Sequence, residues 1–105
     1  GINEYDLCDL IGNMLDNAIE SSEKTENAVI EVSIRSDKYK LMITVSNSIS
    51  QSVLSSNPKL KTTKNQAEQH GFGVKTIRSI VQKYNGSADF YEEDLTFFCR
   101  VILGK

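Results

Sequence analysis

The amino-acid sequence predicts an α+β fold, a two-layer sandwich in which helices cover one face of a mixed, mostly antiparallel sheet. Two segments carry apolar residues at helical spacing, and the segments that follow each of them are rich in β-forming residues. The resulting order is helix, two strands, long polar segment, helix, two strands, which favours helices packed on one side of a sheet. A length of 105 residues predicts one domain, 1–105, with a single core.

Composition narrows the classes of partner. The net charge is −2, from 12 basic and 14 acidic residues, which argues against broad electrostatic binding to nucleic acid. No apolar run approaches the roughly 18–20 residues of a membrane span, and the start GINEYDLCDL lacks the basic region of a signal peptide. We therefore expect a cytoplasmic domain that makes no membrane contact. The chain begins almost inside its first helix, so we expect it to be a piece of something longer.

The first element is an amphipathic helix over residues 4–22, EYDLCDLIGNMLDNAIESS, with Asn3 as its N-cap. Its apolar stripe consists of Leu7, Leu10, Ile11, Met14, Leu15, Ala18 and Ile19. A polar loop then leads to AVIEVSIR (28–35) and KLMITVSN (40–47), two β-rich runs that predict an antiparallel hairpin.

Residues 48–69, SISQSVLSSNPKLKTTKNQAEQ, form a polar stretch with little periodicity. A long segment of this kind within a compact domain is usually functional or mobile. The second amphipathic helix is predicted over 72–84, with Gly86 as its C-cap. A closing hairpin follows, made of SADFYEE and LTFFCRVIL around a turn at Glu93–Asp94.

Two asparagines stand out on the polar face of the first helix. Asn13 and Asn17 are one turn apart, so their amide oxygens can point at one place. One interpretation is a solvated face that carries a chance pair of asparagines. The other is an oxygen-rich site for Mg²⁺, an ion that is usually held by one or two protein oxygens together with substrate phosphates.

A Gly-x-Gly, formed by Gly71 and Gly73, precedes the second helix. Glycines at a helix N-terminus let backbone N–H groups approach an anion, and the helix dipole adds to the attraction. A plain turn is the alternative, and neither the dinucleotide fingerprint nor the P-loop pattern is present. The preceding KLKTTK, which includes Lys64, is either a solvated loop or a source of cations for a polyphosphate.

His70 is the only histidine of the chain. No nucleophile–base pattern accompanies it, and a metal site would need more ligands than one histidine and two distant cysteines. It is therefore either a polar residue outside the helix or a contact to a bound phosphate.

Taken together, NMLDNAIE (13–20), VSNS (45–48), TTK (62–64) and HGFGVKTI (70–77) occur in the order and with the gaps of one known family. The chain resembles the ATP-binding catalytic domain of sensor histidine kinases, within the superfamily that includes DNA gyrase, a class of heat-shock chaperones and the MutL repair proteins. It is most similar to the peptide-sensing branch that includes the accessory-gene-regulator kinases of Gram-positive bacteria. The resemblance implies the Bergerat-type ATP-binding fold.

The resemblance also implies roles for individual residues. Asn13 and Asn17 match the asparagines that hold Mg²⁺ against the ATP phosphates, Asn17 most clearly. Residues 48–69 match the ATP lid, and Asn47 stands where most members have an adenine-reading aspartate. The remaining implied nucleotide contacts are Lys64, His70, Gly71 and Gly73 to the phosphates and Thr96 behind the adenine.

The chain departs from the family pattern at the D-x-G-x-G box, where it reads NSISQ. An asparagine still accepts a hydrogen bond from an adenine amino group but lacks the charge. Hydrolytic members of the superfamily place a glutamate base at the position of Asn13, and asparagine cannot take a proton from water. Slow hydrolysis and transfer to another acceptor are therefore expected.

In this family the acceptor is a histidine on a helical dimerisation domain upstream, which this chain does not contain. The implied partners are ATP, that domain of the parent kinase and a response regulator. The parent is expected to be a homodimeric, membrane-bound sensor, and this chain alone is not expected to autophosphorylate.

Two other functions are consistent with the sequence. The absent D-x-G-x-G box suggests a degenerate nucleotide-binding or pseudokinase module that signals without phosphoryl transfer. An anti-sigma-type serine kinase of the same superfamily is the second alternative, although such kinases usually keep the aspartate that Asn47 replaces.

Overall fold

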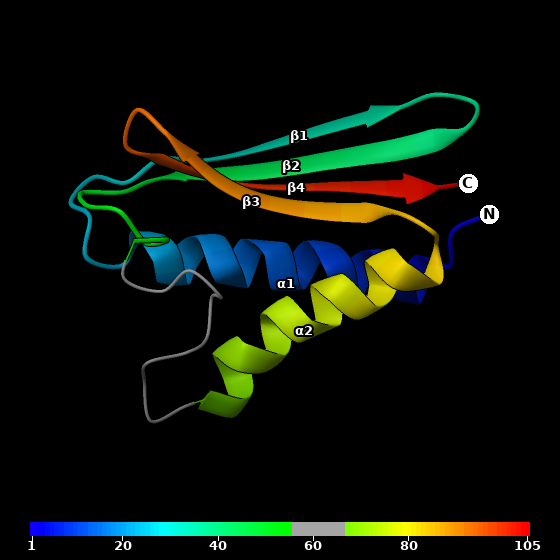
Figure 1. Cartoon of the computed structure of the whole chain (residues 1–105), viewed down its shortest axis with the longest axis horizontal. Helices are drawn as coiled ribbons and strands as arrows, with labels where there is room; N and C mark the ends of the chain where they lie inside the picture. The colour runs from blue at the N-terminus through cyan, green and yellow to red at the C-terminus, as the bar shows by residue number, and fades with distance from the viewer. Residues whose placement is uncertain (56–66) are drawn as a thin grey trace.

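The computed structural model describes residues 1–55 and 67–105 and has a sheet layer and a helix layer (Figure 1). The sheet has four strands in the order β1-β2-β4-β3, and every neighbouring pair is antiparallel. The predicted α+β sandwich is therefore confirmed, with a fully antiparallel sheet in place of a mixed one. The elements in chain order are α1 (Glu4–Ser22), β1 (Ile30–Ser36), β2 (Lys40–Ser48), α2 (Ala67–Lys83), β3 (Ser87–Glu93) and β4 (Thr96–Gly104).

Helix α1 has the predicted bounds and the predicted cap. The Asn3 side-chain oxygen accepts hydrogen bonds from the backbone N–H groups of Tyr5, at 2.8 Å, and Asp6, at 3.3 Å. Asn3 thus satisfies two of the donors that a helix start leaves without an intrahelical acceptor. No helix within residues 1–55 and 67–105 is both long and apolar enough to cross a membrane.

Two clusters of buried apolar residues are present in the described part of the chain, the smaller one made of Ile49, Val74 and Phe97. Alternate residues of β2 and β4 point toward the helices and are buried, as the period of two in a strand requires. The largest cluster of buried residues comprises Leu10, Met14 and Ala18 of α1, Ile77, Ile80 and Val81 of α2, and Ile43, Val45, Cys99, Val101 and Leu103 of the sheet.

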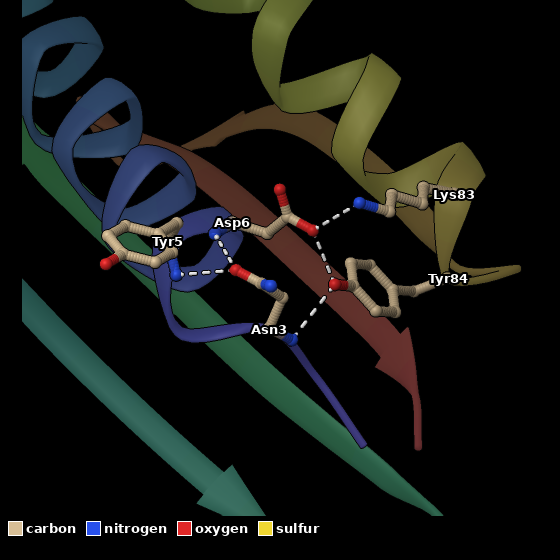
Figure 2. Close-up of polar contacts among 5 residues, drawn as sticks. All are labelled: Asn3, Tyr5, Asp6, Lys83 and Tyr84. Carbon is tan, nitrogen blue, oxygen red and sulfur yellow. Dashed lines mark hydrogen bonds and ion pairs between the residues drawn. The ribbon is translucent and has the colours of Figure 1, made fainter.

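Polar contacts join the start of α1 to the end of α2 (Figure 2). The Tyr84 hydroxyl donates to the Asp6 carboxylate at 2.5 Å and accepts from the Asn3 backbone N–H at 3.0 Å. The Lys83 ammonium lies 2.8 Å from the same carboxylate oxygen. These contacts hold the two helices together at the end of the molecule where both chain termini lie (Figure 1).

Helix α2 ends in a Schellman motif. The Gly86 N–H bonds to the Val81 carbonyl at 2.8 Å, and the Asn85 N–H bonds to the Gln82 carbonyl at 3.2 Å. The left-handed residue is Asn85, with φ of 52°, so the prediction of Gly86 for that role is wrong. Gly86 is needed for another reason, because a Cβ there would lie 1.9 Å from the Ile102 carbonyl oxygen.

The closing hairpin turns one residue later than predicted. Asp94 and Leu95 both have positive φ, 50° and 54°, which is the conformation of a two-residue type I′ turn. This turn suits the twist of the flanking strands, and it places Leu95 in a region that side chains with a Cβ disfavour. The Leu95 carbonyl accepts a hydrogen bond from the Ile49 N–H at 3.0 Å, which joins the turn to the segment after β2.

Candidate functional site

Three predicted site residues come from α2, from the end of β2 and from α1, the helix that contacts both of these elements. The C-terminal end of β2 and the N-terminal end of α2 lie toward the same end of the molecule, opposite the chain termini (Figure 1). Asn47 is the penultimate residue of β2, Asn17 is in the second half of α1, and Gly73 is in the first half of α2. The fold therefore brings together segments that are far apart in the sequence.

Asn13 meets α2 directly. Its amide nitrogen donates to the Asp9 carbonyl one turn earlier, at 2.7 Å, which fixes the orientation of the side chain. Its amide oxygen lies 3.4 Å from the place that a Cβ on Gly73 would occupy. The Gly73 residue itself is buried, so its missing side chain leaves α2 close to this oxygen.

Asn17 carries a polar atom without a partner. Its amide nitrogen is buried and has no hydrogen-bond acceptor within the described part of the chain. A buried donor left unpaired costs about 1–3 kcal/mol, and such groups are rare in folded proteins. An amide donor in this position matches the oxygen of an anionic ligand.

Asn47 also has a buried polar atom without a partner in the described part of the chain, but this atom is an acceptor and not a donor. The residue is only 1% exposed, and its amide nitrogen donates to the Ser48 carbonyl at 3.2 Å. Its amide oxygen is buried without a donor among residues 1–55 and 67–105. Because the nitrogen is held by Ser48, the atom left for a ligand is a hydrogen-bond acceptor.

The glycines Gly71 and Gly73 do not stand at a helix entrance. The helix predicted over 72–84 begins at Ala67, so both glycines lie inside it. Alanine, glutamate and glutamine are good helix formers, which explains the earlier start at AEQ. As interior residues of a helix, these glycines have intrahelical acceptors for their N–H groups.

Thr96 lies in the strand next to Asn47, one position away in the register. Asn47 pairs with Phe97 in the sheet, and both side chains point toward the helices. Thr96 pairs with Ser48, and its side chain points to the opposite face because successive residues of a strand alternate. The role of Thr96 behind the adenine stays a prediction, and the register places its side chain on the other face of the sheet from that of Asn47.

The structure does not describe the side chains of two other predicted site residues, Lys64 and His70. Lys64 lies outside the described residues, as do residues 56–66 of the predicted lid. His70 falls within α2, but its side chain is not among those described.

Glu92 is an anchoring residue that the sequence motifs did not indicate. Its carboxylate accepts hydrogen bonds from the Ser52 hydroxyl at 2.6 Å and from the N–H groups of Val53, at 2.6 Å, and Leu54, at 3.0 Å. Burial raises the pKa of Glu92, but the hydrogen bonds from Ser52, Leu54 and Val53 outweigh it and hold the pKa below its usual value. Glu92 thus fastens the start of the segment that leads from β2 toward α2.

Solved structures with this fold include the catalytic domain of histidine kinase ThkA. One nucleotide-free form matches with a TM-score of 0.78 at 21% identity, covering 99% of this chain and 69% of that chain. A second form gives 0.76 at 17% identity, with 99% and 68% covered. The histidine kinase domain of a blue-light activated kinase from Erythrobacter litoralis gives 0.60 at 10% identity, with 89% and 45% covered. These likenesses establish the shared fold.

A comparison with curated protein sequences finds no significant match. The family model described as the GHKL domain matches residues 2–104, nearly the whole chain. The match spans both helices and all four strands, including the segments that carry Asn13, Asn17, Asn47 and Gly73. The chain belongs to the GHKL domain family.

Proposed function

We propose that the chain binds ATP with Mg²⁺ and serves as the catalytic domain of a sensor histidine kinase. The observation that carries this proposal is the pair of buried, unpartnered amide atoms, Asn17 Nδ2 on α1 and Asn47 Oδ1 near the end of β2, a strand that α1 contacts. Unpaired atoms of this kind are accounted for by a ligand that supplies one acceptor and one donor.

Asn47 is proposed to read the adenine base. Its free atom is an acceptor, and the adenine amino group is a donor. The bond from its amide nitrogen to Ser48 opposes rotation of the amide, so the residue favours a base that donates at this position.

Asn13 and Asn17 are proposed to face the phosphates. Their amide groups fit a Mg²⁺–phosphate ligand, because carbonyl-type oxygens suit the ion and amide N–H groups suit phosphate oxygens. Mg²⁺ bound there would supply positive charge that offsets the negative charge of the phosphates. The chain's own contribution is to hold the ligand in place, with Asn13 oriented by Asp9 and by the close approach of Gly73.

The glycines are proposed to act after a local change in α2. Their N–H groups are engaged while the helix begins at Ala67. Glycine disfavours a helix interior by about 1 kcal/mol relative to alanine, so the first turns of α2 are cheap to unwind. Unwinding to Gly71 or Gly73 would free backbone donors for the phosphates, with Lys64 and His70 as further proposed contacts.

The proposed reaction is transfer of the ATP γ-phosphoryl group to a histidine on a separate upstream dimerisation domain. The contribution of this domain is positioning and electrostatic stabilisation, as in other phosphoryl transfers. Asn13 has no basic group, so activation of water is not expected here. We further propose that residues 1–105 form one domain of a membrane-bound, homodimeric sensor of the accessory-gene-regulator type, which passes the phosphoryl group to a response regulator.

A nucleotide-binding module without transfer activity is the second candidate. The observation that favours it is the sequence NSISQ (47–51), which begins at Asn47 near the end of β2 and lacks the D-x-G-x-G pattern. In this case ATP binding would persist, and the parent protein would show no phosphohistidine.

The base preference of Asn47 provides the test. Isothermal titration with Mg-ATP and Mg-ITP should show tighter binding of ATP, because inosine presents a carbonyl where adenine presents an amino group. Substitution of Asn47→Leu, which is similar in size, should remove most of this discrimination. Equal affinity of the unmodified chain for the two nucleotides, or absence of binding at millimolar ATP, would contradict the proposal.

A further inference from the structure

The segment that follows β2 is held by β3, which is not the next strand in the sheet but the one beyond it. The Glu92 carboxylate of β3 accepts hydrogen bonds from the Ser52 hydroxyl and the Val53 N–H, each at 2.6 Å. The same carboxylate accepts from the Leu54 N–H at 3.0 Å. Because β4 lies between β2 and β3, residues 49–54 cross β4 to reach this carboxylate. One side chain thus fixes the far end of the crossing.

The sheet register places Glu92 in the same row as Asn47. Glu92 pairs with Phe97 of β4, and Phe97 pairs with Asn47 of β2. Residues directly opposite one another across neighbouring strands share a face of the sheet, so all three side chains lie on the face that the helices cover. Phe97 and Asn47 are each 1% exposed. The anchor therefore stands in line with Asn47, with one buried aromatic side chain between them.

Apolar packing joins the anchored segment to α2. The smaller cluster consists of the buried residues Ile49, Val74 and Phe97, with Val53, Leu54 and Phe90 packed against them. Val74 directly follows Gly73, and Ile49 is two residues after Asn47. Ile49 is only 5% exposed and stands where the D-x-G-x-G pattern has its first glycine. The cluster thus connects the neighbours of two proposed ligand contacts with the segment that Glu92 holds.

The charge of Glu92 matters for the strength of this anchor. Hydrogen bonds to an ionised acceptor are roughly twice as strong as those between neutral groups. The Ser52 hydroxyl also accepts from the Ser55 N–H at 3.0 Å while it donates to Glu92, so the bonds form a connected chain. Bonds connected in this way strengthen one another. Loss of the charge would therefore loosen the whole turn and not one contact alone.

We propose that Glu92 is a positioning residue for base recognition, an inference that rests on the proposed nucleotide site. Glu92 acts through residues 49–54, which it holds over the cluster beside Asn47, and it does not touch the ligand. A hydrogen-bonding group discriminates strongly when a mismatched ligand leaves it buried and unpaired. Loosening of the segment admits water to Asn47 Oδ1, and that water satisfies the atom when the base offers no donor. The anchor therefore sustains the preference for adenine.

Isothermal titration of Mg-ATP and Mg-ITP into Glu92→Gln tests this role. The substitution keeps the shape of the side chain and removes its charge. The ratio of the two affinities should fall about fivefold relative to the unmodified chain, which corresponds to the loss of one ordinary hydrogen bond. A variant that is only less stable lowers both affinities by one factor and leaves their ratio unchanged. Glu93→Gln is the matched control, because it removes the same charge from an exposed neighbouring residue and should not alter the ratio.

Ser52→Ala tests whether Glu92 acts through the segment. It removes one of the three donors, so it should lower the ratio less than Glu92→Gln does. In the double variant E92Q/S52A the loss should be smaller than the product of the two single losses, because both residues act through one turn. A full preference for ATP in folded Glu92→Gln, or losses that simply multiply, would overturn this inference and leave the proposed function standing. An unmodified chain that binds neither nucleotide, or both equally, would overturn the proposed function and this inference with it.

Discussion

Asn13 and Gly73 meet across the interface between α1 and α2, with the Asn13 amide oxygen 3.4 Å from where a Gly73 Cβ would lie. The distance is an ordinary van der Waals contact, so a methyl group fits there but covers the oxygen. At position 73, helix stability favours alanine, whereas access to the Asn13 amide oxygen favours glycine. The structure accounts for a glycine in a place where alanine would favour the helix.

Gly73→Ala is predicted to separate stability from binding. Alanine favours a helix interior by about 1 kcal/mol over glycine, so the free energy of unfolding should rise by about that amount. The added methyl group should hinder access to Asn13, so Mg-ATP affinity should fall. Urea denaturation and isothermal titration on the same sample measure both effects.

Gly12→Ala is the matched control for this substitution. Gly12 is an exposed position of α1, and a Cβ there meets nothing within 4 Å. It should give a similar gain in stability with unchanged affinity. Equal losses of affinity in the two variants would mean that the contact with Asn13 is not the cause.

The Glu92 carboxylate is predicted to anchor the segment that follows β2. Glu92→Gln should speed hydrogen exchange at the Val53 and Leu54 amides, because a neutral amide is a weaker acceptor than a carboxylate. Glu93→Gln, at an exposed neighbouring position, should leave both amides unchanged. If Glu92→Gln leaves the exchange of both amides unchanged, the Glu92 carboxylate is not their anchor.

The pH dependence of this anchor follows from the lowered pKa of Glu92. A carboxylate whose pKa is lower in the folded chain contributes stability above its usual value of 4.5 and loses it as pH falls through the folded value. The protection of the Val53 and Leu54 amides against hydrogen exchange, corrected for intrinsic exchange, should therefore decrease as the pH is lowered below about 4.5. This decrease should be smaller in Glu92→Gln, which has no carboxylate at this position to protonate.

Leu95→Gly is predicted to stabilise the fold. Leu95 has φ of 54° and is 60% exposed, so its side chain contributes little packing while its Cβ disfavours the conformation. Glycine should remove about 1 kcal/mol of backbone strain at this position, which should raise the unfolding temperature by roughly 4–8 °C. Leu95→Ala keeps the Cβ and should give no such rise; equal effects of the two substitutions would exclude backbone relief as the cause.

Tyr84→Phe is predicted to loosen the junction shown in Figure 2, since it removes the hydroxyl that joins Asn3 and Asp6. Hydrogen bonds from Lys83 and Tyr84 lower the pKa of Asp6, so its contribution to stability is present above its usual value of 3.8 and lost as pH falls below it. The midpoint of urea denaturation should drop more at pH 7 than at pH 3. Tyr5→Phe, at a residue that is 83% exposed, should have no effect; an equal loss at both pH values would contradict the role of Asp6.

Local signals predicted much of the fold. The bounds of α1 and its Asn3 cap follow from helical spacing and a capping side chain, and both are confirmed. The two hairpins follow from β-rich runs separated by short polar turns, and their strands lie within two residues of the predicted bounds at each end. The pairing of Asn13 with Gly73 depends on how the helices pack, and no local pattern contains it.

The errors arose where two signals compete. The glycines near residue 71 suggested a helix start, whereas the helix formers before them extend α2 to Ala67. The left-handed residue after α2 is Asn85 and not Gly86, because asparagine also tolerates positive φ and Gly86 is needed for its close approach to Ile102. The carboxylate of Glu92 binds backbone groups nearly forty residues away in the chain, and a contact of that kind leaves no motif.

Titration of Mg-ATP into the chain and into Asn17→Ala, by calorimetry, tests the central claim most directly. The fold predicts that the unmodified chain binds, and that Asn17→Ala loses binding while its urea denaturation shows an intact, no less stable fold, because the substitution removes an unpaired buried donor. Unchanged affinity of a folded Asn17→Ala, or no binding by the unmodified chain, would contradict the claim that this domain is a Mg-ATP site built around Asn17.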